Sequence, residues 1–229
     1  MRAPSRLVLA AITATAALAG LGSASASAAP TSHAVFVQTD NTAGNQIVSY
    51  DRATDGTLTQ AGSFDTGGLG GVLTGSASDH LAAQSSLLYD SANNLLFAVN
   101  AGSNTVSVFA VIKDQLALRQ VISSGGTFPV SVAEHGDAVY VLNALEGASI
   151  QGFAVVRGRL VPIRGSSRAL GLDPNATPQF VNTPGQVAFS PDGTQLIVTT
   201  KANGSSIDVF AVKANGTPSK APVINAEPG

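Results

Sequence analysis

Three histidines are the side chains in this sequence best suited to move protons near neutral pH. They are His33, His80 and His135, and the last two follow an acidic residue directly, Asp79 and Glu134. An imidazole beside a carboxylate can act as a general acid or base. We therefore take His80, His135 and Glu134 as candidate catalytic residues. The alternatives are that His80 lies in a solvated loop and that Glu134 and His135 lie in an exposed turn.

One basic cluster could hold an acidic substrate. It consists of Arg157, Arg159, Arg164 and Arg168. A guanidinium suits a carboxylate or phosphate because its N–H groups form a planar fork. Arg157 and Arg159 flank a glycine in a predicted hairpin and should point into solvent. Arg168 lies in a long insertion, and we take it as the candidate substrate-binding residue.

Other motifs that would indicate a cofactor are missing from the sequence. No HxH or HExxH pattern supports a metal site. The run "GGLGGVLTG" has leucine where a dinucleotide fingerprint needs its third glycine, and no βαβ pattern surrounds it. No G-x-S-x-G nucleophile motif is present. We therefore expect neither a metal nor a cofactor.

The composition favours a globular exported protein. The chain has 229 residues, 44% of them apolar and 11% charged, with a net charge of -2. Its 12 Lys and Arg residues are scattered, which argues against a nucleic-acid partner. There is no cysteine, so stability must come from apolar burial and strand pairing.

The first residues have the pattern of a secretory signal peptide. Arg2 and Arg6 precede an apolar run over residues 7–21, and small residues follow at 24–28. We predict cleavage near Ala28, a mature domain over residues 29–229, a secreted protein and no membrane association after cleavage. The alternative is a membrane anchor, but the run is shorter than the roughly 20 residues that a spanning helix needs.

The mature chain repeats one unit four times. Each copy has an apolar strand, a polar turn and an alternating strand, as in "LLFAVNAGSNTVSVFAV" and "LIVTTKANGSSIDVFAV". The strand patterns predict antiparallel units at residues 33–66, 86–123, 129–164 and 185–225, with long loops between some of them and no convincing helix. An aromatic residue recurs near the end of each alternating strand: Tyr50, Phe109, Phe153 and Phe210.

Such units bury both faces only by stacking on one another, which is the arrangement of a β-propeller. We therefore predict an all-β protein made of about four blades, each a four-stranded antiparallel sheet. Tight turns are expected at Asp55-Gly56, Asp192-Gly193 and Asn215-Gly216, with comparable turns at Asn93-Asn94 and His135-Gly136. The alternative is a β-sandwich, which does not explain repeats in register.

The segments "SPDGTQLIVTTKANGSSIDVFAV" and "SGGTFPVSVAEHGDAVYVLNA" resemble blades of the secreted lactonase-family β-propellers. That family includes 6-phosphogluconolactonase-like proteins and carboxymuconate cyclases, and the likeness to exported bacterial members labelled 3-carboxymuconate cyclase is strongest. The resemblance implies a seven-bladed ring, of which this chain supplies about four blades, so we expect an incomplete, open ring; the alternative is a closed four-bladed ring. The first repeat begins at "HAVFV" without the preceding strand, so the open edge could self-associate.

The resemblance implies an enzyme that opens or closes a small lactone or carboxylate ring. A histidine that relatives carry before the second blade has no counterpart in "SSLLYDSANNLLF", so that role is not carried over. Two hypotheses stay open: a lactonase or muconate-cyclase-like enzyme, and a non-catalytic extracellular binding scaffold.

Overall fold

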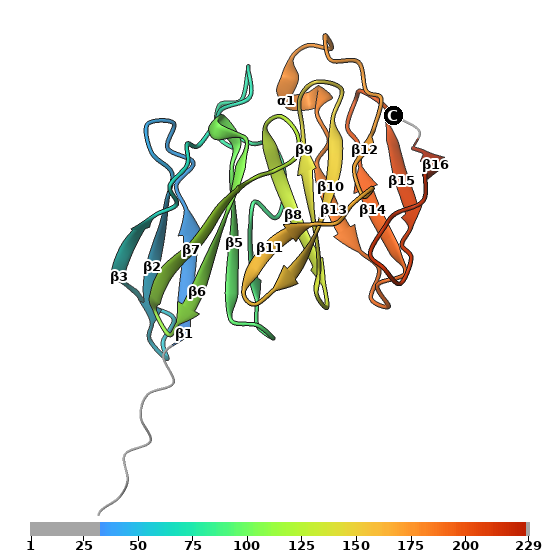
Figure 1. The fold of residues 1–229 in the computed structure, drawn as a ribbon. Helices are drawn as coiled ribbons and strands as arrows, with labels where there is room; N and C mark the ends of the chain where they lie inside the picture. Colours follow the sequence, from blue (N-terminus) through green and yellow to red (C-terminus); the bar gives the residue numbers. More distant parts are fainter. Residues whose placement is uncertain (1–32, 228–229) are drawn as a thin grey trace, which may run out of the picture. The chain divides into compact units, whose positions relative to one another are not determined.

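The computed structural model describes residues 33–227, and four antiparallel sheets account for about half of them. Figure 1 shows the sheets following one another in chain order, from the blue strands of the first to the red strands of the fourth. The predicted signal peptide and its cleavage site lie outside the described residues. Within residues 33–227, no helix is long and apolar enough to cross a lipid bilayer.

The first sheet has three strands and the second has four, paired in chain order. The strands of the first sheet are β1 (His33–Gln38), β2 (Gln46–Arg52) and β3 (Leu58–Asp65). Those of the second are β4 (Leu87–Asp90), β5 (Leu95–Asn100), β6 (Thr105–Ile112) and β7 (Gln115–Ser123). A short 3₁₀ turn, η1 (Ala101–Ser103), joins β5 to β6.

The third and fourth sheets repeat the four-stranded order. The third contains β8 (Pro129–His135), β9 (Ala138–Asn143), β10 (Ser149–Val156) and β11 (Arg159–Pro162), and the short β12 (Arg168–Ala169) also pairs with β10. The fourth contains β13 (Gln186–Phe189), β14 (Gln195–Thr199), β15 (Ser206–Ala211) and β16 (Val223–Ala226). One four-residue helix, α1 (Gln179–Asn182), lies in the loop before β13 and is not predicted by the sequence pattern.

The first strands of the later sheets meet one another. Strand β8 contacts β4 and β5 on one side and β13 on the other. The first sheet has no equivalent strand among the described residues, because it begins at β1 and pairs from there to β2. That the first repeat starts one strand late stays a prediction.

The predicted turns form as their residue types require. Gly56, Gly193 and Gly216 have φ angles of 91°, 69° and 76°, in the region that residues with a Cβ rarely adopt. Asn94 and Gly136 also have positive φ, at 52° and 59°. These residues set the hairpins that join successive strands and thereby fix the register of each sheet.

Strand β6 shows how the sheets bury each other's faces. Phe109 belongs to a cluster with Ile47, Phe36 and Phe64 of the first sheet. Its neighbour Val108 points to the opposite face of β6 and belongs to the larger cluster, which joins the second, third and fourth sheets. Both side chains are at most 1% exposed. This stacking of four sheets confirms the predicted blades and excludes a two-sheet sandwich.

A buried polar network ties the first sheet to the second at the end where the long loops lie. The Asn45 amide donates to the Val99 carbonyl and to Asn100 Oδ1, both at 3.0 Å. Asn100 in turn donates to the Ser107 hydroxyl at 2.8 Å, which donates to the Thr66 carbonyl at 2.7 Å. Because these buried side chains find partners, their burial does not leave an unpaired polar group.

We expect Phe109→Ala to lower the free energy of unfolding by about 3–5 kcal/mol, because it removes a buried ring between two sheets. Ile112→Ala is the matched control on the same strand, since Ile112 is 61% exposed; it should change stability by less than about 0.5 kcal/mol. Urea unfolding of both variants measures the difference. Equal losses would contradict the buried position of Phe109.

Candidate functional site

The structure does not bring the predicted catalytic residues together. His80 lies in the loop between β3 and β4, where Asp40 interacts with it electrostatically. Glu134 lies near Asp90. Asp40 is hydrogen-bonded to Gln38, whose amide donates to the Val99 carbonyl near the C-terminal end of β5. Asp90 instead pairs with Leu95, at the N-terminal end of β5. His80 and the Glu134–His135 pair therefore sit at opposite ends of the sheets.

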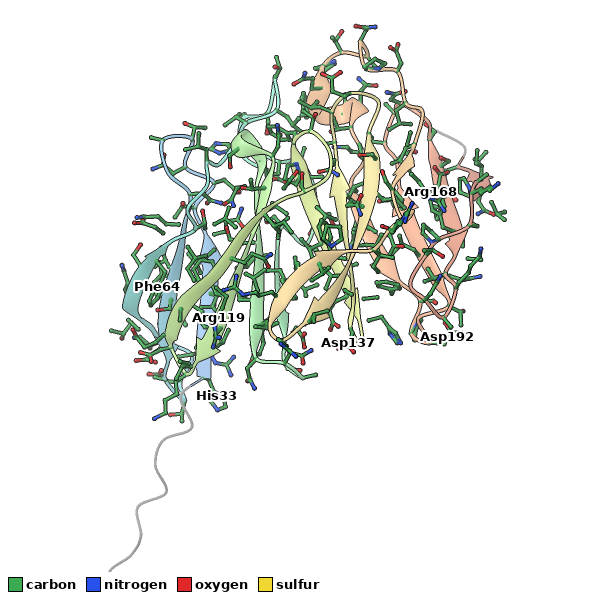
Figure 2. All side chains as sticks on the ribbon, viewed as in Figure 1. His33, Phe64, Arg119, Asp137, Arg168 and Asp192 are labelled. Atoms are coloured by element: carbon green, nitrogen blue, oxygen red, sulfur yellow. The ribbon has the colours of Figure 1, made fainter. Side chains whose placement is uncertain are left out.

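Glu134 and His135 are the last two residues of β8 and lead into the hairpin to β9, as predicted. Burial raises the pKa of Glu134, repulsion from Asp90 raises it further, and His135 lowers it. The His135 ring is 5.9 Å from the ring of Phe189. His135 also borders a groove of about 560 Å³ that includes Asp137 and Asp192, and Figure 2 shows both of these labelled carboxylates at this end of the sheets.

Arg168 uses its guanidinium to hold two loops together. It donates from Nε to the Ser219 carbonyl at 2.7 Å and from Nη2 to the Pro218 carbonyl at 2.5 Å. Nη1 donates to the carbonyls of Gly165 and Ser167 at 2.9 Å and 2.6 Å. Figure 2 places Arg168 beside the fourth sheet. Its role as a substrate-binding residue stays a prediction, and its contacts indicate a structural one.

Replacing Arg168 by Gln should lower the free energy of unfolding by about 1–2 kcal/mol, since it removes charge-assisted hydrogen bonds to backbone carbonyls. Arg164→Gln is the control, because Arg164 is exposed on the same segment and should have little effect. Thermal and urea unfolding test the pair. If Arg168→Gln leaves stability unchanged, these hydrogen bonds do not hold the loops.

A pocket of about 580 Å³ lies beside the β3–β4 loop. It is lined by polar side chains that were not predicted from the sequence to form a site. The β3–β4 loop contributes Ser76, Ser78, Asp79 and Gln84, and residues from the fourth sheet and its loops contribute Phe180, Gln186, Thr199 and Lys201. One ammonium, one carboxylate, two amides and three hydroxyls thus border a single space. We call it the Lys201 pocket.

Lys201 is held by backbone carbonyls from two different loops. Its Nζ donates to the Ala82 carbonyl at 2.8 Å and to the Phe180 carbonyl at 2.6 Å. An ammonium has three N–H donors, so one remains for a ligand. Burial lowers the pKa of Lys201, and Asp79 raises it in part. The half-buried cation therefore gains from any acceptor that enters the pocket.

Asp79 presents one carboxylate oxygen to its own loop. Its Oδ1 accepts from the backbone N–H groups of Leu81 and Ala82 at 3.2 Å and 3.0 Å, so the carboxylate is fixed in place. Among residues 33–227, no hydrogen bond to Oδ2 is observed. This oxygen is therefore available to accept a proton or a hydroxyl hydrogen bond from a ligand in the Lys201 pocket.

The glycine run in the β3–β4 loop serves close packing. A Cβ at Gly68 would lie 2.4 Å from the Asn100 side chain, and one at Gly70 would lie 2.1 Å from the Asp40 carbonyl oxygen. These distances are shorter than any real Cβ contact, so glycine alone fits. The run lets the loop pass over the buried polar network on its way to Asp79 and His80.

Asp40 lies beside this loop, and its burial makes the charged form of its carboxyl group unfavourable. Burial raises the pKa of Asp40, the Gln38 hydrogen bond and His80 lower it, and Asp79 raises it again. The folded protein therefore binds a proton at Asp40 more tightly than the unfolded chain does. Stability must fall as the pH rises from the ordinary Asp range through the raised pKa.

Asp40→Asn should raise the free energy of unfolding more at pH 7 than at pH 3, because it removes a charge that burial disfavours. Asp55→Asn should show the opposite trend, since hydrogen bonds from Thr57 lower the pKa of Asp55 and its charged form supports the turn. Urea unfolding at both pH values measures the two differences. The same pH trend in both variants would contradict this account of Asp40.

Comparison with known proteins shows the fold. Neither a protein-family model nor a curated protein matches the sequence. The periplasmic gluconolactonase of Pseudomonas aeruginosa matches with a TM-score of 0.60 at 17% identity, over 84% of this chain and 54% of that one. The chain thus spans about half the length of that relative.

Two further solved structures are similar over a larger share of their own length. A proposed 6-phosphogluconolactonase of Bacteroides uniformis matches with a TM-score of 0.49 at 16% identity, over 83% of this chain and 68% of that one. One of Bacteroides fragilis matches with a TM-score of 0.47 at 14% identity, over 83% of this chain and 70% of that one.

The chain has the fold of β-propeller blades. The four stacked antiparallel sheets and the likeness to the P. aeruginosa structure agree on this point. In this architecture, the loops at one end of the blades commonly carry the function, because the sheets hold them rigidly. The Lys201 pocket is built from such loops.

Proposed function

We propose that this protein binds a small lactone of a hydroxy acid in the Lys201 pocket and hydrolyses it. The observation that carries the proposal is the Lys201 ammonium, which two carbonyls hold at 2.8 Å and 2.6 Å in a pocket that the carboxylate of Asp79 also lines. The lactonase named among the similar structures supports the same chemistry by analogy, although a fold alone does not fix a reaction.

The proposed reaction uses one donor and one acceptor. A water molecule attacks the lactone carbonyl carbon while Asp79 Oδ2 takes a proton from it. The free N–H of Lys201 donates to the carbonyl oxygen as negative charge develops there. The bond to the ring oxygen then breaks, and that oxygen receives the proton, giving the open hydroxy acid.

The other polar side chains of the pocket suit a ligand rich in hydroxyl groups. Gln84 and Gln186 carry both donors and acceptors, and Ser76, Ser78 and Thr199 line the same space. His80 follows Asp79 directly and interacts with Asp40, so it can influence the charge state of the loop. We assign to His80 a positioning and electrostatic role.

Lys201→Met should lower kcat/KM for glucono-δ-lactone hydrolysis about 100-fold, because it removes the donor to the developing oxyanion. Lys220→Met is the matched control, since Lys220 is exposed, and it should keep full activity. Acid release in a pH-stat, corrected for spontaneous hydrolysis, measures the rate. Melting temperatures of both variants separate a loss of chemistry from a loss of folding.

Asp79→Asn keeps the shape of the side chain and should lower kcat with little change in KM. Lactone hydrolysis at the spontaneous rate with the wild-type protein would contradict the enzyme proposal. If the lactone or its hydroxy acid nevertheless binds, and Lys201→Met abolishes that binding, the pocket serves a non-catalytic binding scaffold.

A further inference from the structure

The edge of β1 borders a groove of about 700 Å³ between the first and second sheets. No described strand pairs with this edge, whereas β5, β9 and β14 pair there with β4, β8 and β13. The groove shares no residue with the Lys201 pocket. We propose that it binds an extended peptide that adds to β1 as a strand and carries a carboxylate near its C-terminal end.

The backbone of β1 is arranged to receive such a strand. Thr39 N–H donates to the Gln46 carbonyl, and this pair continues the register that aligns Val37 with Val48. Hydrogen-bonded pairs alternate along an antiparallel ladder. Ala34 and Phe36 therefore direct their N–H and C=O groups away from β2, toward the groove, where an added strand could pair with them.

Part of the groove wall is apolar. Phe36 from the first sheet faces Leu87, Leu96 and Val111 from the second, all within one cluster. Tyr89, which also lines the groove, is 45% exposed. Water leaves this surface when an apolar side chain enters, which favours binding.

One end of the groove is basic. His33, Arg52 and Lys113 line it, and none of its described lining residues is Asp or Glu. Figure 2 labels His33 at the end of the sheets away from α1. A strand that pairs antiparallel to β1 has its C-terminal end beside His33, and His33 is aligned with Arg52. A carboxylate at that end of the peptide would complement the charges of Arg52 and Lys113.

The second sheet shows what the added strand should look like. Its strand β4 pairs antiparallel to β5 and reads Leu-Leu-Tyr-Asp, with Asp90 at the C-terminal end. The residues that directly precede β1 are small or polar ("SASAAPTS") and have no large apolar side chain to fill the groove. The peptide partner is therefore one with large apolar residues followed by an acid.

The test uses the full chain and a labelled peptide with the sequence of residues 85–92, SSLLYDSA, followed by fluorescence anisotropy. We expect saturable binding that weakens roughly tenfold in the Arg52→Glu/Lys113→Glu variant, because two charge contacts become repulsive. The matched control is Arg119→Glu/Lys220→Glu, which changes the same net charge at exposed sites outside the groove. It should bind as the wild type does.

Two further measurements isolate the strand pairing and the acid. Ala34→Pro removes one outward N–H of an edge strand, where proline is tolerated, and should abolish binding without changing the circular dichroism spectrum. The peptide SSLLYNSA should bind as weakly to the wild type as SSLLYDSA binds to the Arg52→Glu/Lys113→Glu variant.

Several results would overturn the proposal. They are no saturable binding, binding that Ala34→Pro leaves intact, or equal affinity for the Asp and Asn peptides. Self-association of the chain that the groove variants abolish would assign the edge to a second copy instead. Binding to a chain that begins at residue 33, but not to the full chain, would assign it to the protein's own N-terminal segment.

Discussion

The structure depends on apolar strand faces that only a neighbouring sheet can cover. Val108 and Phe109 are adjacent in β6, point to opposite faces and are both buried, each in a different hydrophobic cluster. Phe153 and Phe210 repeat the position of Phe109 and are also at most 1% exposed. A single sheet of this kind would expose both apolar faces, so each sheet needs its neighbours for stability.

The same constraint explains how much of the fold the sequence predicts. The repeat, the two-residue periodicity and the glycine turns depend on local chemistry, so the four sheets and most strand ends follow from them. The sequence did not predict α1, because its four residues depend on loop packing rather than on a helical pattern. Nor did it predict β12, a two-residue strand in the insertion that follows β11.

The candidate site was harder to predict, because it depends on which loops meet. The residue types of His80, Glu134 and His135 predict a catalytic role, and the structure separates His80 from the other two. The charge of Arg168 predicts substrate binding, whereas its N–H groups donate to backbone carbonyls. Lys201 left one signal: when the repeats "LLFAVN" and "LIVTTK" are aligned, it takes the place of Asn100. A lysine in place of the buried amide side chain of another repeat indicates that this position has a different function.

Hydrogen–deuterium exchange of the backbone amides tests most directly whether the sheets stabilise one another by stacking. The two middle sheets are covered on both faces, and β5 is buried along its whole length, whereas every residue of β16 is exposed. The account predicts the slowest exchange in β5 and β9 and markedly faster exchange in β1 and β16. Equal protection of all four sheets, each exchanging as an independent unit, would contradict it.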